Sequence, residues 1–345
     1  MAIVKILVVA VACFIVALIW MPWLIRFLRK HKLGKNIRDA ASAPIASHLH
    51  AAKAGTPTMG GLVIWVTVAA VIVALYAGCA WLRLDAICRV TFLSRSQTLL
   101  PLGALVAAAL VGLVDDYLNV RRIGPAGGGL RMRYRLLSYT LIALVAAWWF
   151  YTKLQWDIVH VPFAGDVPFG LWYVPFFAFV IVATSHSVNV TDGLDGLAGG
   201  TLMSAFGAYG VIAFAAGKID LAAFCAAIFG ALLAFVWHNI TPAAVFMGDT
   251  GAMALGTVLG IVAMLTNQPL LLPLIGLPFV VESASVLMQV ASKRIRGGKK
   301  IFRSSPLHHH LEAVGWGEPK IVMRFWVVSF VCAWIGVVLA LIDRT

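Results

Sequence analysis

Long apolar runs are the feature that most limits what this chain can fold into. The first begins at Ile6 and reaches about Leu28, with one charged residue, Arg26, near its end. About 20 consecutive apolar residues can cross the hydrocarbon core of a membrane as a helix. The run is too long for the apolar core of a signal peptide, and basic residues follow it where a cleavage site would contain small ones. We therefore predict a first membrane span here.

Composition supports the same class. Of the 345 residues, 61% are hydrophobic and 12% are charged, whereas soluble domains contain about 45–50% apolar and about 25% charged residues. An ordinary soluble domain is therefore excluded. The cysteines stand singly, without the paired spacing of a metal site, so we expect neither a zinc site nor a disulfide framework. They are Cys13, Cys79, Cys88, Cys225 and Cys332.

Apolar segments of crossing length recur along the whole chain. They predict an all-α polytopic membrane protein with about ten transmembrane helices, in a single domain over residues 1–345. The predicted spans lie near 3–28, 60–82, 97–115, 134–152, 171–190, 197–217, 221–238, 249–266, 270–290 and 323–342.

The charge pattern orients these spans. The chain has 27 Lys and Arg residues against 14 Asp and Glu residues, a formal net charge of +13. We expect no nucleic-acid partner, because the basic residues fall in short clusters between the apolar runs. Most of them lie in the loops around 26–53, 121–135 and 293–324, and such residues gather in the cytoplasmic loops of membrane proteins. Both termini are therefore expected outside the cytoplasm.

This orientation places five polar segments on the cytoplasmic face. They are Lys53–Gly61, Asp115–Tyr117, Asn189–Gly196, Asn239–Asp249 and His308–His310. The opposite loops hold only scattered acidic residues such as Asp157, Asp166 and Asp220. We therefore expect the active site at the cytoplasmic face.

The acidic residues of these segments point to a bound cation. Two adjacent carboxylates at the end of an apolar helix, Asp115 and Asp116, repel each other and need a cation or a proton. Asp249 adds another carboxylate on the same face. It would also suit a helix N-cap, but Mg²⁺ prefers a few carboxylates together with substrate phosphate oxygens. The set as a whole predicts a magnesium site.

Two further segments suit a phosphate-containing ligand. Asp192 and Asp195 lie in a Gly-rich stretch, whose glycines let the backbone approach a ligand closely. The run from His308 to His310 lies among basic residues and can donate hydrogen bonds to an anionic phosphate. Glu282 lies inside a predicted span, where a carboxylate usually faces the interior and has a partner; the sequence does not identify that partner.

These residues predict a metal-bound diphosphate substrate that meets a lipid substrate at the membrane surface. In register, the same motifs resemble those of bacterial phospho-N-acetylmuramoyl-pentapeptide-transferases, which belong to the polyprenyl-phosphate N-acetylhexosamine-1-phosphate transferase superfamily (glycosyltransferase family 4). The resemblance covers nearly the whole chain. It rests on Lys53 with Gly55–Gly61, Asp115–Tyr117, Asn189–Gly196, Phe246–Asp249 and Pro306–His310.

The resemblance implies transfer of phospho-MurNAc-pentapeptide from UDP-MurNAc-pentapeptide to undecaprenyl phosphate, giving lipid I and UMP, with Mg²⁺ as cofactor. It also implies a homodimer in the bacterial cytoplasmic (inner) membrane. The implied catalytic residues are Asp115, Asp116, Asp249 and His308, with Asp249 as the metal ligand and Asp115 and Asp116 as further metal candidates. The implied substrate-binding residues are Lys53, Thr58, Asn189, Asp192, Gly193, Leu194, Asp195, Asn239, Phe246, Gln289, His309 and His310.

A few positions depart from the family pattern, and two other functions stay open. Arg135 stands at a Lys position, His186 where Asn is usual, and His238 where Phe is usual. A transferase that uses UDP-GlcNAc would share the carboxylates, but the contiguous His run with Gly315 and Trp316 downstream favours the muropeptide enzyme. A secondary transporter would place its acids near the bilayer midplane, whereas these cluster at one predicted face.

Overall fold

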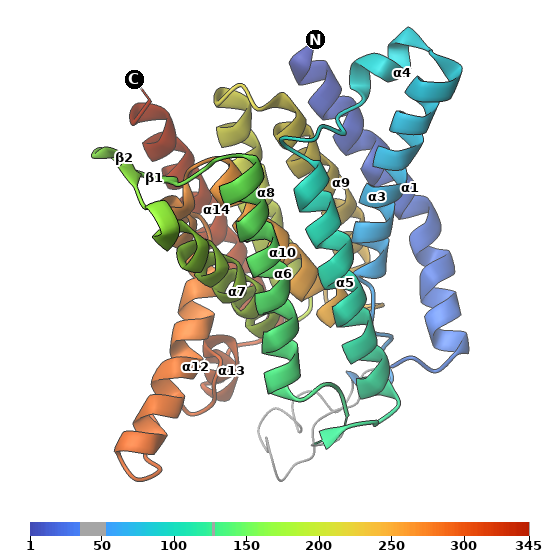
Figure 1. Ribbon diagram of the computed structural model, residues 1–345. Helices are drawn as coiled ribbons and strands as arrows, with labels where there is room; N and C mark the ends of the chain where they lie inside the picture. The colour runs from blue at the N-terminus through green and yellow to red at the C-terminus, as the bar shows by residue number, and fades with distance from the viewer. Residues whose placement is uncertain (35–52, 126–127, 345) are drawn as a thin grey trace.

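The structure is a computed structural model that describes residues 1–34, 53–125 and 128–344, which form a helical bundle (Figure 1). Both ends of the chain lie at the same end of the bundle, the upper end in Figure 1. Among the described residues, eight helices are long and apolar enough to cross a membrane. They are α1 (Ala2–Lys30), α3 (Leu62–Ala77) continued by η2 (Gly78–Leu82), α5 (Leu99–Val120), α6 (Met132–Lys153), α7 (Tyr173–Thr191) preceded by η4 (Gly170–Trp172), α8 (Leu197–Ala215), α9 (Ile219–Asn239) and α14 (Glu318–Ile342).

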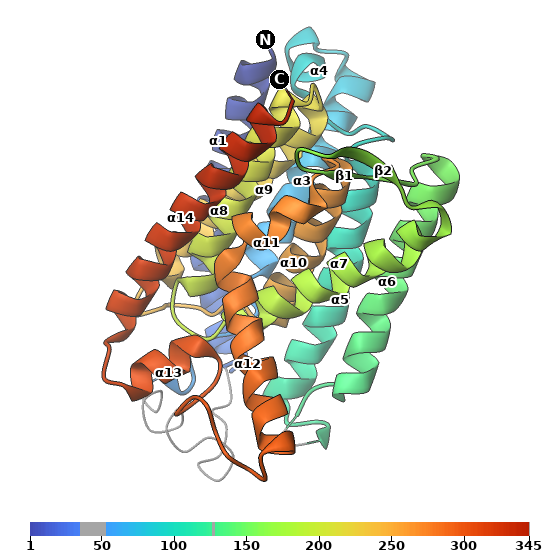
Figure 2. The ribbon, with the colours of Figure 1, turned by 90° about the vertical axis from the view of Figure 1, so that its left-hand side faces the viewer.

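One further apolar segment is sharply bent. The short helices η5 (Pro269–Leu271) and α11 (Leu272–Ile275) meet α12 (Leu277–Ile295) at an angle of 82°. The bend lies at Gly276, and Pro278 follows in the first turn of α12, a position where the missing proline N–H costs no helical hydrogen bond. Figure 2 shows α12 running away from the bend toward the lower end of the molecule. If the bent pair counts as one crossing, the total is nine.

The remaining predicted span corresponds to α10 (Asp249–Leu265), which has 17 residues and is buried from Thr250 to its end. It packs against α5 and α7. Because protein surrounds it, α10 has no need to match the thickness of a bilayer. Each of the ten predicted segments contains a helix, but the described residues give eight or nine helices of crossing length.

Glycines let α10 lie against its neighbours at backbone distance. A methyl group at Gly112 of α5 would lie 2.5 Å from the carbonyl oxygen of Asp249, and one at Gly256 of α10 would lie 2.7 Å from the Cα of Ser185. No other residue fits such separations without a shift of the backbone. Asp115 and Asp116 share one face of α5 with Gly112, because residues three and four apart are neighbours on a helix. The contact at Gly112 therefore brings both carboxylates to the first turn of α10.

The end of the bundle that holds the termini carries a small sheet, an exception to the all-α prediction. Strands β1 (Ile158–Val161) and β2 (Gly165–Pro168) pair antiparallel. His160 contacts Asp166, at 2.7 Å, and Asp343, which follows α14. The backbone N–H of Phe163 in the turn also donates to Asp343. The hairpin is thus fastened to the end of α14.

The same end contains a disulfide bond that the sequence analysis did not expect. Cys79 in η2 and Cys88 in α4 (Asp85–Val90) are joined, nine residues apart. The chain reverses direction between η2 and α4, and this brings the two Cα atoms within 4.8 Å. The prediction failed because it considered the spacing of metal sites rather than a reversal after a span.

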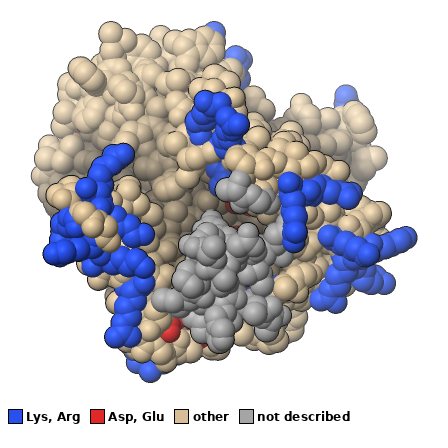
Figure 3. All heavy atoms as spheres, turned by 90° about the horizontal axis from the view of Figure 1, so that it is seen from below, with Lys and Arg blue, Asp and Glu red and all other residues tan. Residues whose placement is uncertain are grey.

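The opposite end of the bundle is formed by loops, by the lower part of α12 and by α13 (Leu307–Ala313). Seen from below, its surface carries many Lys and Arg side chains and few acidic ones (Figure 3). Exposed basic residues at this end include Arg29, Lys30, Arg121, Arg131, Arg133, Lys299 and Lys300. Lys35 and Arg38, which the sequence analysis assigned to the same side, lie outside the described residues.

Candidate active site

Three of the predicted carboxylates meet at the start of α10, at the basic end of the bundle. Asp116 accepts hydrogen bonds from the backbone N–H groups of Asp249 and Thr250, both at 3.0 Å. Although Asp116 belongs to α5, it therefore accepts hydrogen bonds from N–H groups that the first turn of α10 would otherwise leave unpaired. This contact fixes Asp249 relative to α5.

An arginine joins the other two carboxylates. The Arg135 guanidinium at the start of α6 contacts Asp115, and its Nη2 lies 3.1 Å from Oδ2 of Asp249. Asp115 also accepts the N–H of Leu130 at 2.5 Å. Asn189, at the end of α7, donates to Oδ1 of Asp249 at 2.6 Å. Side chains of four helices thus converge on one recessed group of charges.

The donor set fits a magnesium ion that substrate phosphates would complete. Asp115 and Asp249 share one cation already, the guanidinium of Arg135, so a positive charge is stabilised at this place. No group of three or more His, Cys, Asp or Glu side chains within the described residues is arranged as a complete metal site. Mg²⁺ is commonly held by only one or two carboxylates together with substrate phosphates. Asp249 and Asp115 are the residues that would hold it.

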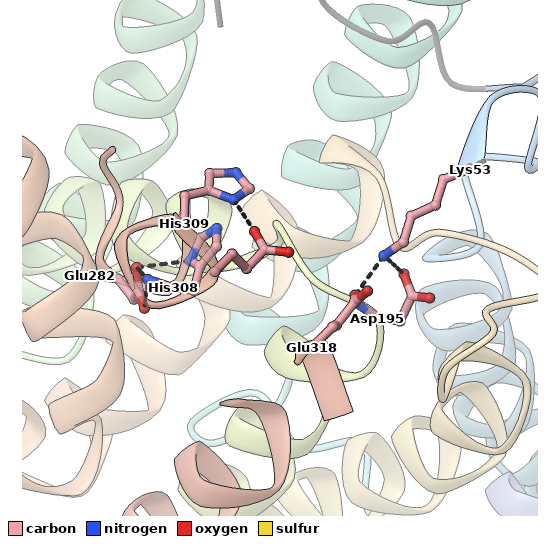
Figure 4. A network of polar contacts seen from close by, with 7 residues as sticks. Lys53, Asp195, Glu282, His308, His309 and Glu318 are labelled. Atoms are coloured by element: carbon pink, nitrogen blue, oxygen red, sulfur yellow. Dashed lines mark hydrogen bonds and ion pairs between the residues drawn. The ribbon is translucent and has the colours of Figure 1, made fainter. Parts of the chain in front are cut away.

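A second charged cluster surrounds Lys53 (Figure 4). The ammonium group lies 2.6 Å from Oδ1 of Asp195 and 2.5 Å from Oε1 of Glu318. Oδ2 of Asp195 accepts the N–H of Ala243 at 3.1 Å. Asp195 thereby joins Lys53 to the loop that leads to Asp249.

The loops that carry the predicted motifs are bound to one another through their backbones. The N–H of Phe246 donates to Pro57, and its carbonyl accepts from Gly60, both at 2.8 Å. Asn239 is buried and accepts the N–H of Gly196 at 3.0 Å. Its amide also donates to the carbonyl of Val245 at 2.8 Å. The backbone that carries the half-buried Phe246 side chain is therefore fixed by hydrogen bonds at both its N–H and its carbonyl.

The partner of Glu282 is His308. Nδ1 of His308 lies 2.9 Å from Oε2 of Glu282, and both side chains are buried. A carboxylate at Nδ1 fixes the ring orientation and the tautomer, since Nδ1 must then carry the proton. Nε2 is buried and has no hydrogen-bond partner among the described residues. It faces Gly193, where a methyl group would lie 2.2 Å from it.

The other predicted binding residues take several positions. His309 contacts Glu312 at 2.7 Å, and His310 accepts the N–H of Arg303. Gln289 is buried and bonds the backbone of Ile301 and Phe302, so here it supports the loop before α13. The hydroxyl of Thr58 lies near Gly248.

The segment that contains Asp192 and Leu194 follows α7 directly. Asp192 is its first residue and is half-buried. Leu194 is buried and packs in a small apolar cluster with Leu197, Ile321 and Val322. This cluster joins the segment to α14.

The three departures from the family pattern differ in position. Arg135 lies inside the carboxylate group, where a cation is needed. His186 is half-buried in α7, one turn before Asn189. His238 contacts the carbonyl of Ala234 within its own helix. Of the three, Arg135 alone contacts a predicted catalytic residue in the hydrogen bonds and ion pairs of the described residues.

Two contacts of the candidate site were not predicted from the sequence. Glu318 follows Gly317 at the start of the last apolar helix, where an acidic residue usually complements the helix dipole, so nothing in the sequence related it to Lys53. Glu282 was recognised as unusual, but its partner lies 26 residues away, on a separate helix. Both pairings depend on how helices pack.

Comparison with known proteins agrees with the motifs. Residues 98–267 match glycosyl transferase family 4, and residues 53–64 match signature 1 of the phospho-N-acetylmuramoyl-pentapeptide-transferases. A phospho-N-acetylmuramoyl-pentapeptide-transferase from Chloroflexus aurantiacus is 41% identical, over 97% of this chain and 89% of its own length. One from Geobacillus thermodenitrificans is 40% identical over 96% and 97%, and one from Anoxybacillus flavithermus is 38% identical over 94% of each chain. The chain therefore belongs to the phospho-N-acetylmuramoyl-pentapeptide-transferase family.

Proposed function

We propose that this chain transfers phospho-MurNAc-pentapeptide from UDP-MurNAc-pentapeptide to undecaprenyl phosphate, producing lipid I and UMP. Membership of the family supports this reaction. The observation that carries the proposal is the pairing of two different charged clusters at one end of the bundle. One joins Asp115, Asp249 and Arg135; the other joins Lys53, Asp195 and Glu318.

The two clusters suit the two parts of a UDP-linked substrate. The first contains a guanidinium, whose planar fork matches phosphate oxygens. The second has one ammonium group between two carboxylates and, unlike the first, would hold no magnesium ion to offset their charge, so it suits the neutral uracil and ribose. Stacking of uracil on the ring of Phe246 would contribute about 1–3 kcal/mol.

Each carboxylate of the first cluster has its own part in the proposed reaction. A magnesium ion held by Asp249 and Asp115 would neutralise charge on the diphosphate. The side-chain amide of Asn189 orients Asp249. Asp116 keeps the start of α10 in place. Asp115 would act beside the reacting phosphates either as this second metal ligand or as base or nucleophile. His308 offers Nε2 on the Gly193 side of the site.

We further propose that the clusters face the cytoplasm and that both termini lie outside it, in a bacterial inner membrane. The exposed basic residues gather at the end that holds the clusters, as cytoplasmic loops do. The disulfide Cys79–Cys88 lies at the opposite end, and disulfides persist in oxidising compartments such as the periplasm. These two observations are independent, and both support the same orientation.

Release of UMP tests the reaction. Purified protein in detergent, supplied with UDP-MurNAc-pentapeptide, undecaprenyl phosphate and Mg²⁺, should release UMP and form a lipid-linked product. UDP-GlcNAc should not replace the muropeptide donor. UMP release with UDP-GlcNAc as donor, and none with UDP-MurNAc-pentapeptide, would assign the chain to the other transferases of the superfamily.

Thiol labelling tests the orientation. In intact spheroplasts, a membrane-impermeant reagent should label Cys79 and Cys88 after mild reduction. The same reagent should label an Arg133→Cys variant at that position only after the membrane is permeabilised. The remaining cysteines, Cys13, Cys225 and Cys332, are buried and should give little background. Labelling of Arg133→Cys in intact cells would contradict the orientation.

A further inference from the structure

The segment around Asp195 rests on α14 through several contacts. The indole N–H of Trp326 donates to the carbonyl of Gly196 at 3.0 Å. Ile321 and Val322 pack against Leu194 in the same region. The first turns of α14 therefore form a platform under this segment.

Glu318 adds a charged contact at the edge of the platform. One oxygen, Oε1, accepts the backbone N–H of Asp195 at 2.7 Å and contacts the ammonium of Lys53 at 2.5 Å. The side chain of Glu318 is 14% exposed and that of Lys53 is 21% exposed. Hydrogen bonds to charged groups are worth more when they are partly shielded from water. Glu318 therefore fixes Lys53 and the backbone of Asp195 together.

The geometry around Lys53 depends on both of its carboxylates. An ammonium group has three N–H donors, and Asp195 and Glu318 engage two of them. One donor remains for an acceptor outside this pair. If Glu318 lost its charge, Asp195 would be the one carboxylate of the pair left to hold Lys53, and the direction of the remaining donors would be fixed less firmly.

We propose that Glu318 is a positioning residue that directs Lys53 and the Asp195 segment toward the uridine part of the donor substrate. This inference rests on the proposed function. The partner it implies is a neutral hydrogen-bond acceptor such as a uracil carbonyl, because a cluster with net negative charge and no metal ion to offset it disfavours an anionic group. Glu318 is not a catalytic residue, since the reacting phosphates belong to the other cluster.

The test compares Glu318→Gln with Glu318→Ala in full-length protein. Glutamine keeps an oxygen that can accept the N–H of Asp195 but carries no charge for Lys53. The KM for UDP-MurNAc-pentapeptide should rise about tenfold in Glu318→Gln and further in Glu318→Ala. The kcat and the KM for undecaprenyl phosphate should stay within about threefold of the wild type. A merely structural role would change both substrates alike.

A double variant and a matched control complete the test. Lys53→Met and Lys53→Met/Glu318→Gln should have the same KM for the donor, because Glu318 acts through Lys53. Asp220→Asn breaks a comparable pair with Lys5, at 2.7 Å, at the other end of the bundle, and should leave both KM values unchanged. If Glu318→Gln does not fold, Glu318→Asp, which keeps the charge on a shorter side chain, should have a lower KM for the donor than Glu318→Ala; an equal KM would overturn the role of the charge.

The outcomes separate this inference from the proposed function. An unchanged donor KM in folded Glu318→Gln, or additive effects in the double variant, would overturn the positioning role while wild-type turnover persists. Absence of UMP release by the wild type would instead overturn the proposed function.

Discussion

Charged side chains fasten loops to helices at both ends of the bundle, but Asp166 of the hairpin is far more exposed than the acids of the candidate site. At the end with the termini, the side chain of Asp166 is 51% exposed beside His160. At the site end, the side chains of Asp115 and Asp195 are each 3% exposed. Exposed ion pairs contribute little to stability, whereas buried charges carry a desolvation penalty. We expect from this difference that the buried acids of the candidate site serve binding and chemistry.

The largest expected effect tests this difference directly. Asp249→Asn should lower turnover by about a thousandfold or more, because it removes a charge from the group that would hold the diphosphate and its metal. Asp166→Asn is the matched change at the other end and should alter turnover less than about twofold. UMP release measures both. Near-normal activity of Asp249→Asn would show that the burial of this cluster has another cause.

The next effect concerns the buried pair of Glu282 and His308. Glu282→Ala should lower kcat by about a hundredfold, because Nδ1 of His308 loses the acceptor that fixes its tautomer. Glu282→Gln should lose less activity, since its amide oxygen can still accept that hydrogen. Steady-state kinetics of protein that remains monodisperse in detergent would measure this. Equal activity of Glu282→Ala and the wild type would exclude an orienting role for Glu282.

A smaller effect should follow from the close contact at Gly112. In Gly112→Ala the new methyl group would overlap the backbone of Asp249, so we expect a loss of about 1–3 kcal/mol of stability together with reduced activity. Gly103→Ala on the same helix meets no atom within 4 Å and should be stabilising by about 0.5–1 kcal/mol. Thermal melting with parallel activity assays compares them. Equal melting temperatures of the two variants would contradict the contact.

The smallest effect concerns pH at the end with the termini. Burial lowers the pKa of His160, but its hydrogen bonds with Asp343 and Asp166 and their charges outweigh burial, so that its pKa lies above 6.5. The hydrogen bonds from His160 and from the N–H of Phe163 lower the pKa of Asp343 below 3.8. A raised histidine pKa gives stability that is complete below pH 6.5, and this stability is lost as the pH rises through the raised pKa of the folded protein. A lowered carboxyl pKa gives stability that is complete above pH 3.8 and lost as the pH falls.

The hairpin should therefore be held most firmly between these two values, and less firmly at pH 9. Hydrogen-exchange protection factors of residues 158–168 should fall as the pH rises from about 6.5 to 9. His160→Gln should remove this dependence on pH. Turnover of His160→Gln at a fixed pH should match the wild type. A large loss of turnover would mean that the two ends are not independent.

The sequence predicted the helical segments well because each depends on a local property, the length of an apolar run. The segment 249–266 illustrates the limit of that property: α10 is apolar because it is enclosed by protein, and its composition does not distinguish this from contact with lipid. The disulfide between Cys79 and Cys88 and the strands of the hairpin depend on chain reversals, which apolar runs do not encode.

The candidate site shows a similar division. Asp115, Asp116 and Asp249 were predicted from residue type and predicted side, and the structure brings them together. Glu318 could not be predicted, because its contact with Lys53 spans 265 residues and depends on the packing of α14. Gln289 shows the opposite case: the resemblance implied a substrate-binding residue, and its side chain bonds the adjacent loop.

The enclosed helix α10 has a consequence for how deep the chemistry lies. Its 17 residues rise about 25 Å at 1.5 Å per residue, less than the ~30 Å of a bilayer's hydrocarbon layer. A helix of this length along the membrane normal cannot reach both headgroup regions, and Asp249 stands at one of its ends. We expect the acids to form the floor of a wet depression sunk toward the lipid tails. There the water-soluble donor could meet the lipid acceptor. The donor would stay in water, and the acceptor's chain would stay in the bilayer.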